Sequence, residues 1–304
     1  MLKKSLLIFI FIFLFFPGNS FAQENTGITV MPSIVHLDLS QDPPEYELTY
    51  TNTTKVNINL LLTVQDFSEL EDSYRVNFLD PKDAQNYKYS LSSWISFENK
   101  NIQLAPGEKK SVKIFIDKNR ITKGGHYASI LAEIVQPDTN KQVGVKAVLS
   151  SLLFVRASTG LEVEEGKINS FMPLRDEIEY PDSYSLRFEN SGNVHVVPYG
   201  LVQVFDPLGN LVAKGIVNEN SLDALPESIR NYEIKVNTYQ KLLFPGIYTA
   251  KISLHFGKTN QKTYTETAFF SQGSFDFVKI GILLFVIIIL LIYYKKRKKN
   301  ETNS

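Results

Sequence analysis

The stretch YELTYTNTTKV at residues 46–56 decides the fold class, because its first five residues alternate apolar and polar side chains. Alternation with a period of two places the two kinds of side chain on opposite faces of a β-strand, so we expect a half-buried strand here. The pattern returns as YSLRFENSGNV at residues 184–194, with Tyr, Leu, an aromatic residue, Asn and Val at the same spacing. An amphipathic strand that occurs twice indicates two copies of one β-rich unit.

The signals that follow each copy come in the same order. Leu104-Ala105-Pro106 and Leu225-Pro226 each precede an alternating run, and Gly125-His126-Tyr127 and Gly246-Ile247-Tyr248 each begin another strand. Glycine permits a bend where a strand enters a sandwich, and the tyrosine two residues later can pack its ring inside. The ordered repetition indicates that one β-sandwich occurs twice, with the seam near residues 158–160.

Both ends of the chain are apolar and flanked by lysines. Residues 1–22 combine two early lysines, an apolar run and small residues, which is typical of a secretory signal peptide. Residues 277–294 form a second apolar run, followed by the basic segment 295–304, which favours the cytoplasmic side of a membrane. We therefore predict a single-pass cell-membrane protein with its N-terminal domains outside the cytoplasm, its C-terminus inside, and the lipid bilayer as a partner of residues 277–294.

These observations define the predicted fold class. It is an all-β protein with two tandem immunoglobulin-like β-sandwiches, at residues 23–158 and 159–272, followed by one transmembrane α-helix. The chain has no cysteine, so neither a disulfide framework nor a lipid-anchored cysteine is available. The formal net charge is zero, and the region between the two apolar ends has an excess of acidic side chains. No basic face for nucleic acid is therefore expected.

The sequence contains no recognisable catalytic pattern. The four histidines (His36, His126, His195 and His255) stand singly, without the paired spacing typical of metal ligands. No nucleophile elbow, phosphate-binding loop or dinucleotide fingerprint is present. We therefore predict that the protein is not an enzyme and has no catalytic, cofactor-binding or metal site. For the acidic run at residues 162–165, a solvated edge and a cation that bridges the domains near Glu164 are the two alternatives.

The predicted binding residues are Tyr74, Tyr87 and Tyr89. They lie in residues 68–90, the least regular part of the first sandwich, and long loops in compact domains often carry function. Trp94 is the only tryptophan; its apolar neighbours favour packing in the first core, and the alternative is an exposed ring that stacks on a sugar.

Residues 28–158 resemble the first outer domain of the WxL-interacting protein family of bacterial surface proteins. The resemblance is carried by VMPSI (30–34), the strand and turn at 46–52, SWI (93–95), LAPGE (104–108) and GGHYASI (124–130). It implies an immunoglobulin-like first domain that binds peptidoglycan and a second domain that binds surface proteins.

The function predicted from these features is cell-envelope binding or adhesion, with two β-sandwiches presented to cell-wall glycan or to another surface protein. The alternative is an envelope assembly factor similar to periplasmic pilus chaperones, which binds client strands at an exposed sheet edge. Residues 143–155, a long and mostly apolar run, are the candidate edge for this alternative. An open edge there favours the assembly factor, and a strand paired along its whole length favours adhesion.

Overall fold

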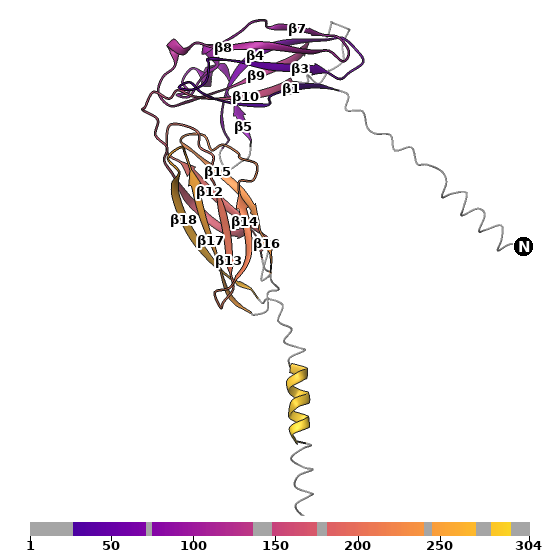
Figure 1. Ribbon diagram of the computed structural model, residues 1–304, viewed down its shortest axis with the longest axis vertical. Coiled ribbons are helices and arrows are strands. Elements are labelled where there is room, and N and C mark those ends of the chain that lie inside the picture. The colour runs from indigo at the N-terminus through magenta and orange to yellow at the C-terminus, as the bar shows by residue number, and fades with distance from the viewer. Residues whose placement is uncertain are drawn as a thin grey trace, which may run out of the picture.

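The computed structural model describes residues 27–70, 75–135, 148–174, 181–239, 245–271 and 281–292. They form two β-sandwiches that meet at one end of each, and a separate helix at residues 281–292 (Figure 1). The prediction of a mainly β protein with two tandem sandwiches is confirmed. The seam expected at residues 158–160 falls between the last strand of the first sandwich and the first strand of the second.

The first sandwich has two sheets. One has the order β1 (Ile28–Met31), β3 (Glu45–Asn52), β8 (Lys109–Ile116) and β6 (Ile95–Phe97). The other has the order β2 (Ile34–Asp38), β10 (Val148–Arg156), β9 (Gly125–Val135), β4 (Ile58–Glu69) and β5 (Val76–Phe78), and β7 (Asn101–Leu104) also pairs with β4. Short helical turns lie at α2 (Pro81–Ala84), η1 (Ser92–Trp94) and η2 (Lys118–Arg120).

The second sandwich repeats this plan. Its smaller sheet has the order β11 (Gly166–Leu174), β12 (Ser183–Asn190) and β15 (Ser228–Lys235). Its larger sheet has the order β16 (Asn237–Thr238), β14 (Leu211–Val217), β13 (Tyr199–Phe205), β17 (Gly246–Phe256) and β18 (Gln261–Ser271). The stretch that predicted the fold forms β3 in the first sandwich, and its repeat forms β12 in the second.

The asparagine at the end of each repeated strand has the same structural role. The Asn52 side-chain amide donates to the carbonyl oxygens of Val56 at 2.8 Å and Leu104 at 3.1 Å. The Asn190 amide donates to the carbonyl oxygens of Val194 at 2.8 Å and Ala224 at 2.9 Å. Both asparagines are fully buried, and their amide hydrogen bonds hold the backbone of the turn that follows each repeated strand. The repeat in the sequence is therefore a repeat of structure.

Each sandwich has its own apolar core. Leu48 and Tyr50 of β3 face the first core, and Leu186 and Phe188 of β12 face the second, as the alternation predicts. Trp94 packs against the first core, which confirms its expected location.

The structure describes only part of the two chain-end segments for which a signal peptide and a transmembrane helix are predicted. Residues 281–292 are helical, while 277–280 and 293–294 lie outside the described residues, as do residues 1–22 and 295–304. Among the helices that the structure describes, none combines the length and the apolar character needed to cross a membrane. The signal peptide, the transmembrane helix at 277–294 and the basic tail therefore stay predictions.

Candidate functional site

Strand β10 has a neighbour on both sides over only half of its length. All of its residues pair antiparallel with β9, from Val148 opposite Glu133 to Arg156 opposite Gly125. On its other side, β2 pairs with it in parallel, and this pairing covers residues 152–156 only. Before β2 the chain belongs to the opposite sheet, where β1 pairs with β3. Within the described residues, Val148–Ser151 therefore form an open sheet edge, which we call the open half of β10.

The backbone of the open half directs hydrogen-bonding groups away from β9. The N–H of Leu152 donates to the carbonyl oxygen of Ser33 at 2.9 Å, so residue 152 faces the β2 side. Because successive residues of a strand point their backbone groups in opposite directions, Ser150 and Val148 face this side too. In the described part of the chain, neither of these two residues has a backbone partner there. An unpaired row of this kind is a template for another strand.

The open half itself has no charged side chain, and exposed apolar side chains lie beside it. Strand β10 carries no charged residue from Val148 to Val155. Val148 is 45% exposed. Between β1 and β2 the chain passes from one sheet to the other, and the residues on the two sides of this passage, Met31 and Ile34, are 70% and 46% exposed. Leu149, Ile28 and Val30 border the first core but are only partly buried. This edge therefore exposes backbone groups and apolar side chains together.

An aromatic cluster at the end of β10 joins the two sandwiches; we call this contact the domain junction. Phe67, Tyr89, Tyr127 and Phe154 of the first sandwich pack together with Leu225 of the second. The hydroxyl of Tyr127 accepts a hydrogen bond from the backbone N–H of His195 at 2.8 Å. The tyrosine that was expected to pack in its own sandwich therefore binds the other domain.

Charged side chains surround this cluster. The guanidinium of Arg230 lies 3.2 Å from the carboxylate of Glu69. Burial raises the pKa of Glu69, while the charge of Arg230 and hydrogen bonds from Leu225 and Ser228 oppose this increase. Arg156 pairs with Glu164 at 2.5 Å, with both side chains largely buried.

Two more ion pairs cross the junction, and both are more exposed than the pair of Arg156 and Glu164. Lys258 contacts Asp38, and Lys88 lies 2.5 Å from Glu227. At Glu164 the sequence had left open a solvated edge or a bridging cation. Glu164 itself is buried and holds the guanidinium of Arg156, which contradicts a solvated edge at this residue, whereas Glu165 of the same run is exposed.

Two glycines allow the domains to approach closely. Gly124 has φ of +98°, and a Cβ built on it would lie 2.6 Å from the carbonyl oxygen of Asn193. A Cβ on Gly125 would lie 2.0 Å from the Tyr127 hydroxyl oxygen. The N–H of Gly125 donates to the carbonyl oxygen of Asn193 at 2.8 Å. Side chains at these two positions would separate the backbones that meet there.

Two of the three predicted binding tyrosines, Tyr87 and Tyr89, lie at the domain junction. Tyr89 is 3% exposed, and Tyr87 packs against the same aromatic cluster with its ring centroid 5.8 Å from that of Tyr89. Tyr74 lies outside the described residues. Their role in binding stays a prediction, but Tyr87 and Tyr89 contribute their rings to domain packing.

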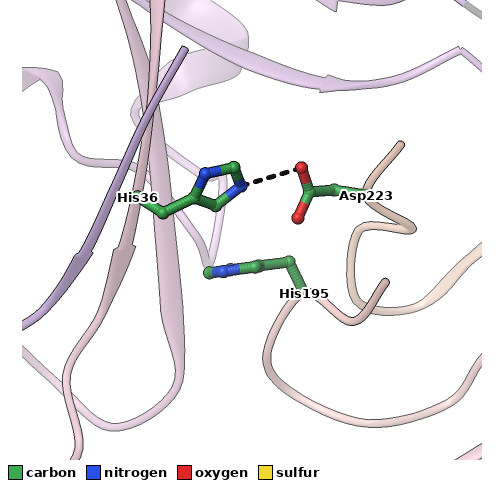
Figure 2. A group of neighbouring side chains, drawn as sticks. All are labelled: His36, His195 and Asp223. Atoms are coloured by element: carbon green, nitrogen blue, oxygen red, sulfur yellow. Dashed lines mark hydrogen bonds and ion pairs between the residues drawn. The ribbon is translucent and has the colours of Figure 1, made fainter. Parts of the chain in front are cut away.

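Sequence reasoning missed one group of side chains at the junction. His36, His195 and Asp223 each offer an atom suited to a metal, and these atoms lie within 4.8 Å of one another (Figure 2). His36 Nε2 is 2.9 Å from Asp223 Oδ2. Burial lowers the pKa of His195 to about 4, so this imidazole is neutral at pH 7. The three positions are distant in the sequence, and no local spacing could have indicated that they meet.

A scan against models of protein families found no match, and a search of the curated proteins found none. Among solved structures, the class 5 fimbriae chaperone CfaA is similar, with 10% identity and a TM-score of 0.40, over 81% of this chain and 99% of that chain. The Pseudomonas aeruginosa CupB2 chaperone has 11% identity and a TM-score of 0.38, over 79% and 99%. The Salmonella enterica SafA pilin–SafB chaperone complex gives 8% identity and a TM-score of 0.39, over 82% and 98%.

Proposed function

We propose that this chain is an assembly factor of the cell envelope that binds an extended segment of a client protein at the open half of β10. The observation that carries the proposal is the partial pairing of β10, in which β2 covers residues 152–156 and leaves Val148–Ser151 open among the described residues. In strand addition, backbone hydrogen bonds supply affinity and alternate side chains supply specificity. The open half of β10 offers both kinds of contact.

The client strand would lie in line with β2, in the position that β2 does not reach. Its backbone would pair with the outward N–H and carbonyl groups of Val148 and Ser150. Its inward side chains would meet Leu149 and Val30, which border the first core and are incompletely buried. Covering apolar surface is favourable by roughly 25 cal/mol per Å². A client segment with alternating apolar residues would therefore complete the edge of the first sandwich.

The domain junction supports this function by holding the second sandwich in one orientation. The aromatic cluster and the ion pair between Glu69 and Arg230 are largely buried, so their contacts resist separation of the domains. A fixed second domain at the end of β10 limits how a client can approach the open half. The location in the envelope rests on the predicted signal peptide and membrane segment.

Site-specific photocrosslinking tests the proposal. A photoreactive residue at position 148, in full-length protein in the native cells, should capture a protein through one contiguous segment. The matched control is a photoreactive residue at Tyr264, which is 84% exposed on the edge strand β18 of the second sandwich. Ser150→Pro should abolish capture at position 148, because proline removes an outward N–H. Ser150→Ala, which keeps the N–H, should retain it.

Two outcomes would contradict the proposal. Equal capture at positions 148 and 264 would show that the open half has no particular affinity for clients, and capture that survives Ser150→Pro would exclude backbone pairing there. The peptidoglycan binding implied by the resemblance to the WxL-interacting family makes a different prediction. In that case the full chain would sediment with insoluble cell wall, and Ser150→Pro would leave sedimentation unchanged.

A further inference from the structure

Three side chains from separate parts of the chain converge at the domain junction (Figure 2). His36 lies in β2 of the first sandwich, while His195 and Asp223 lie in connections of the second, after β12 and before β15. The His36 ring stacks on Phe154 with 4.9 Å between centroids, and the His195 ring meets Phe154 edge-on at 5.5 Å. One aromatic side chain thus positions both imidazoles beside the carboxylate.

Asp223 has an unsatisfied acceptor at this point. The residue is 5% exposed, and Oδ1 has no hydrogen-bond partner among the described residues, whereas Oδ2 faces His36. Arg230, the nearby cation, donates to the backbone carbonyl of Asp223 and pairs with Glu69. A buried carboxylate oxygen without a donor is costly, so the site lacks a positive partner.

His195 is available as a ligand. Its ligand nitrogen lies within 4.8 Å of the ligand atoms of His36 and Asp223, and an imidazole nitrogen is among the commonest metal ligands in proteins. The Tyr127 hydroxyl lies 3.3 Å from His195 Nδ1. A hydrogen bond of this kind orients a metal-binding imidazole from its second ring nitrogen.

We propose that His36, His195 and Asp223 bind a divalent transition metal, with zinc as the best fit, and that this metal ties the two sandwiches together. Two imidazole nitrogens and one carboxylate oxygen are typical zinc donors, with a fourth position left for water. Calcium and magnesium require six or more oxygen ligands, which this group does not supply. Ligands about 2.1 Å from a tetrahedral zinc lie roughly 3.4 Å apart. The three ligand atoms lie within 4.8 Å of one another, so the more distant of them must move closer together when the metal binds.

Zinc binding by the untagged full chain tests the inference directly. The chain contains four histidines and no cysteine, so few competing zinc sites exist. Equilibrium dialysis with metal analysis should show one zinc per chain, and His36→Gln should weaken binding by at least about tenfold. The matched control is His255→Gln: that ring stacks on Tyr199 with 5.6 Å between centroids, on the surface of the second sandwich. This variant should bind zinc like the unaltered chain.

Two further readouts separate a ligand role from a structural one. Cobalt bound in place of zinc should give the intense visible absorption of a four-coordinate ion, and His36→Gln should remove it. Added zinc should raise the melting temperature of the unaltered chain and of His255→Gln, but not of Asp223→Asn, because binding to the native state stabilises it. Equal zinc binding by the unaltered chain, His36→Gln and Asp223→Asn would overturn the proposal. It is independent of client binding, so either proposal can fail alone.

Discussion

The two sandwiches begin an equivalent strand with the same Gly-x-Tyr sequence but use its tyrosine differently. In β17, Tyr248 is fully buried within the core of the second sandwich. In β9, Tyr127 is equally buried, yet it packs among Phe67, Tyr89 and Phe154 and bonds His195 of the other domain. The same local sequence thus supports one core in the second domain and the contact between domains in the first.

The last strands of the two sandwiches differ in a related way. Strand β18 pairs with β17 over its whole length, and among the described residues no strand pairs with its other side. It carries Lys262 and Glu266 with exposed side chains, and charges on an edge strand discourage pairing with other chains. Strand β10 is partly covered by β2 and has no charge in its open half. The second domain therefore protects its edge, whereas the first leaves part of its edge able to pair.

The largest expected effect comes from removing the two tyrosines. Tyr127→Ala and Tyr248→Ala should each lower the free energy of unfolding by about 3–5 kcal/mol, because each removes a buried aromatic ring. Only Tyr127→Ala should uncouple the domains, which would appear as two unfolding transitions in calorimetry and faster proteolysis between residues 157 and 165.

Tyr127→Phe is the matched control for this comparison. It keeps the ring and removes only the hydroxyl that accepts from His195, so it should cost about 1 kcal/mol. A single transition in Tyr127→Ala, with the stability lost evenly from both domains, would contradict the assignment of Tyr127 to the junction.

Acid should weaken the junction through His195. Burial lowers the pKa of this side chain from 6.5 to about 4, with Asp223 opposing and His36 and Arg156 adding to the decrease. Between these pH values the unfolded chain binds the proton and the folded chain does not, so stability falls as pH decreases from 6.5 to 4. The loss approaches about 3 kcal/mol at about 1.4 kcal/mol per pKa unit.

His195→Gln isolates this effect. Chemical denaturation in chelator at pH 7 and pH 4.5 should show a smaller loss of stability in this variant than in the unaltered chain. His126→Gln is the control, because His126 is a histidine inside the first sandwich whose pKa is also lowered by burial. If His195→Gln keeps the full pH dependence, protonation of this side chain does not weaken the junction.

The fold could be predicted from the sequence because its cause is local. Alternation in residues 46–50 and 184–188 determines which side chains enter each core, and the repeated spacing reveals the duplication. The junction could not be predicted in this way. His36 and Asp223 meet across 187 positions of sequence, and nothing near either residue indicates the other. Likewise, the Gly-x-Tyr pattern could not show that Tyr127 packs between the domains while Tyr248 packs within one.

The candidate binding edge was predictable only in outline. The apolar character of residues 143–155 indicated a strand that could accept a partner, and the structure describes β10 from Val148 onward. Which half of β10 is open depends on where β2 begins to pair, at Ile34 opposite Leu152. The start of this pairing depends on where the chain passes from the sheet of β1 to the sheet of β10, and no periodic pattern of side chains indicates that point.

Replacing the two equivalent asparagines, Asn52 and Asn190, should have a similar effect in both domains. Asn52→Ala and Asn190→Ala each remove at least two hydrogen bonds from a fully buried side-chain amide to backbone carbonyl groups, which should cost about 2 kcal/mol in the free energy of unfolding. The expected near-equality follows from the matching bonds to Val56 and Val194. Chemical denaturation of each variant measures it. A loss in only one domain would show that the two turns are not equivalent.

The smallest effect on stability, and the sharpest test of the two edges, comes from exchanging their charges. Val148→Lys adds a charge to the open half of β10, and Lys262→Val with Glu266→Val removes the charges of β18. All three positions are exposed, so unfolding free energies should change by less than about 0.5 kcal/mol. The ion pair between Lys251 and Glu266, at 3.4 Å, is exposed and contributes little. Val148→Lys should nevertheless abolish co-purification of the client with the full-length chain, whereas the β18 double variant should self-associate in light scattering. If the β18 double variant stays as soluble as the unaltered chain, charge is not what distinguishes the two edges.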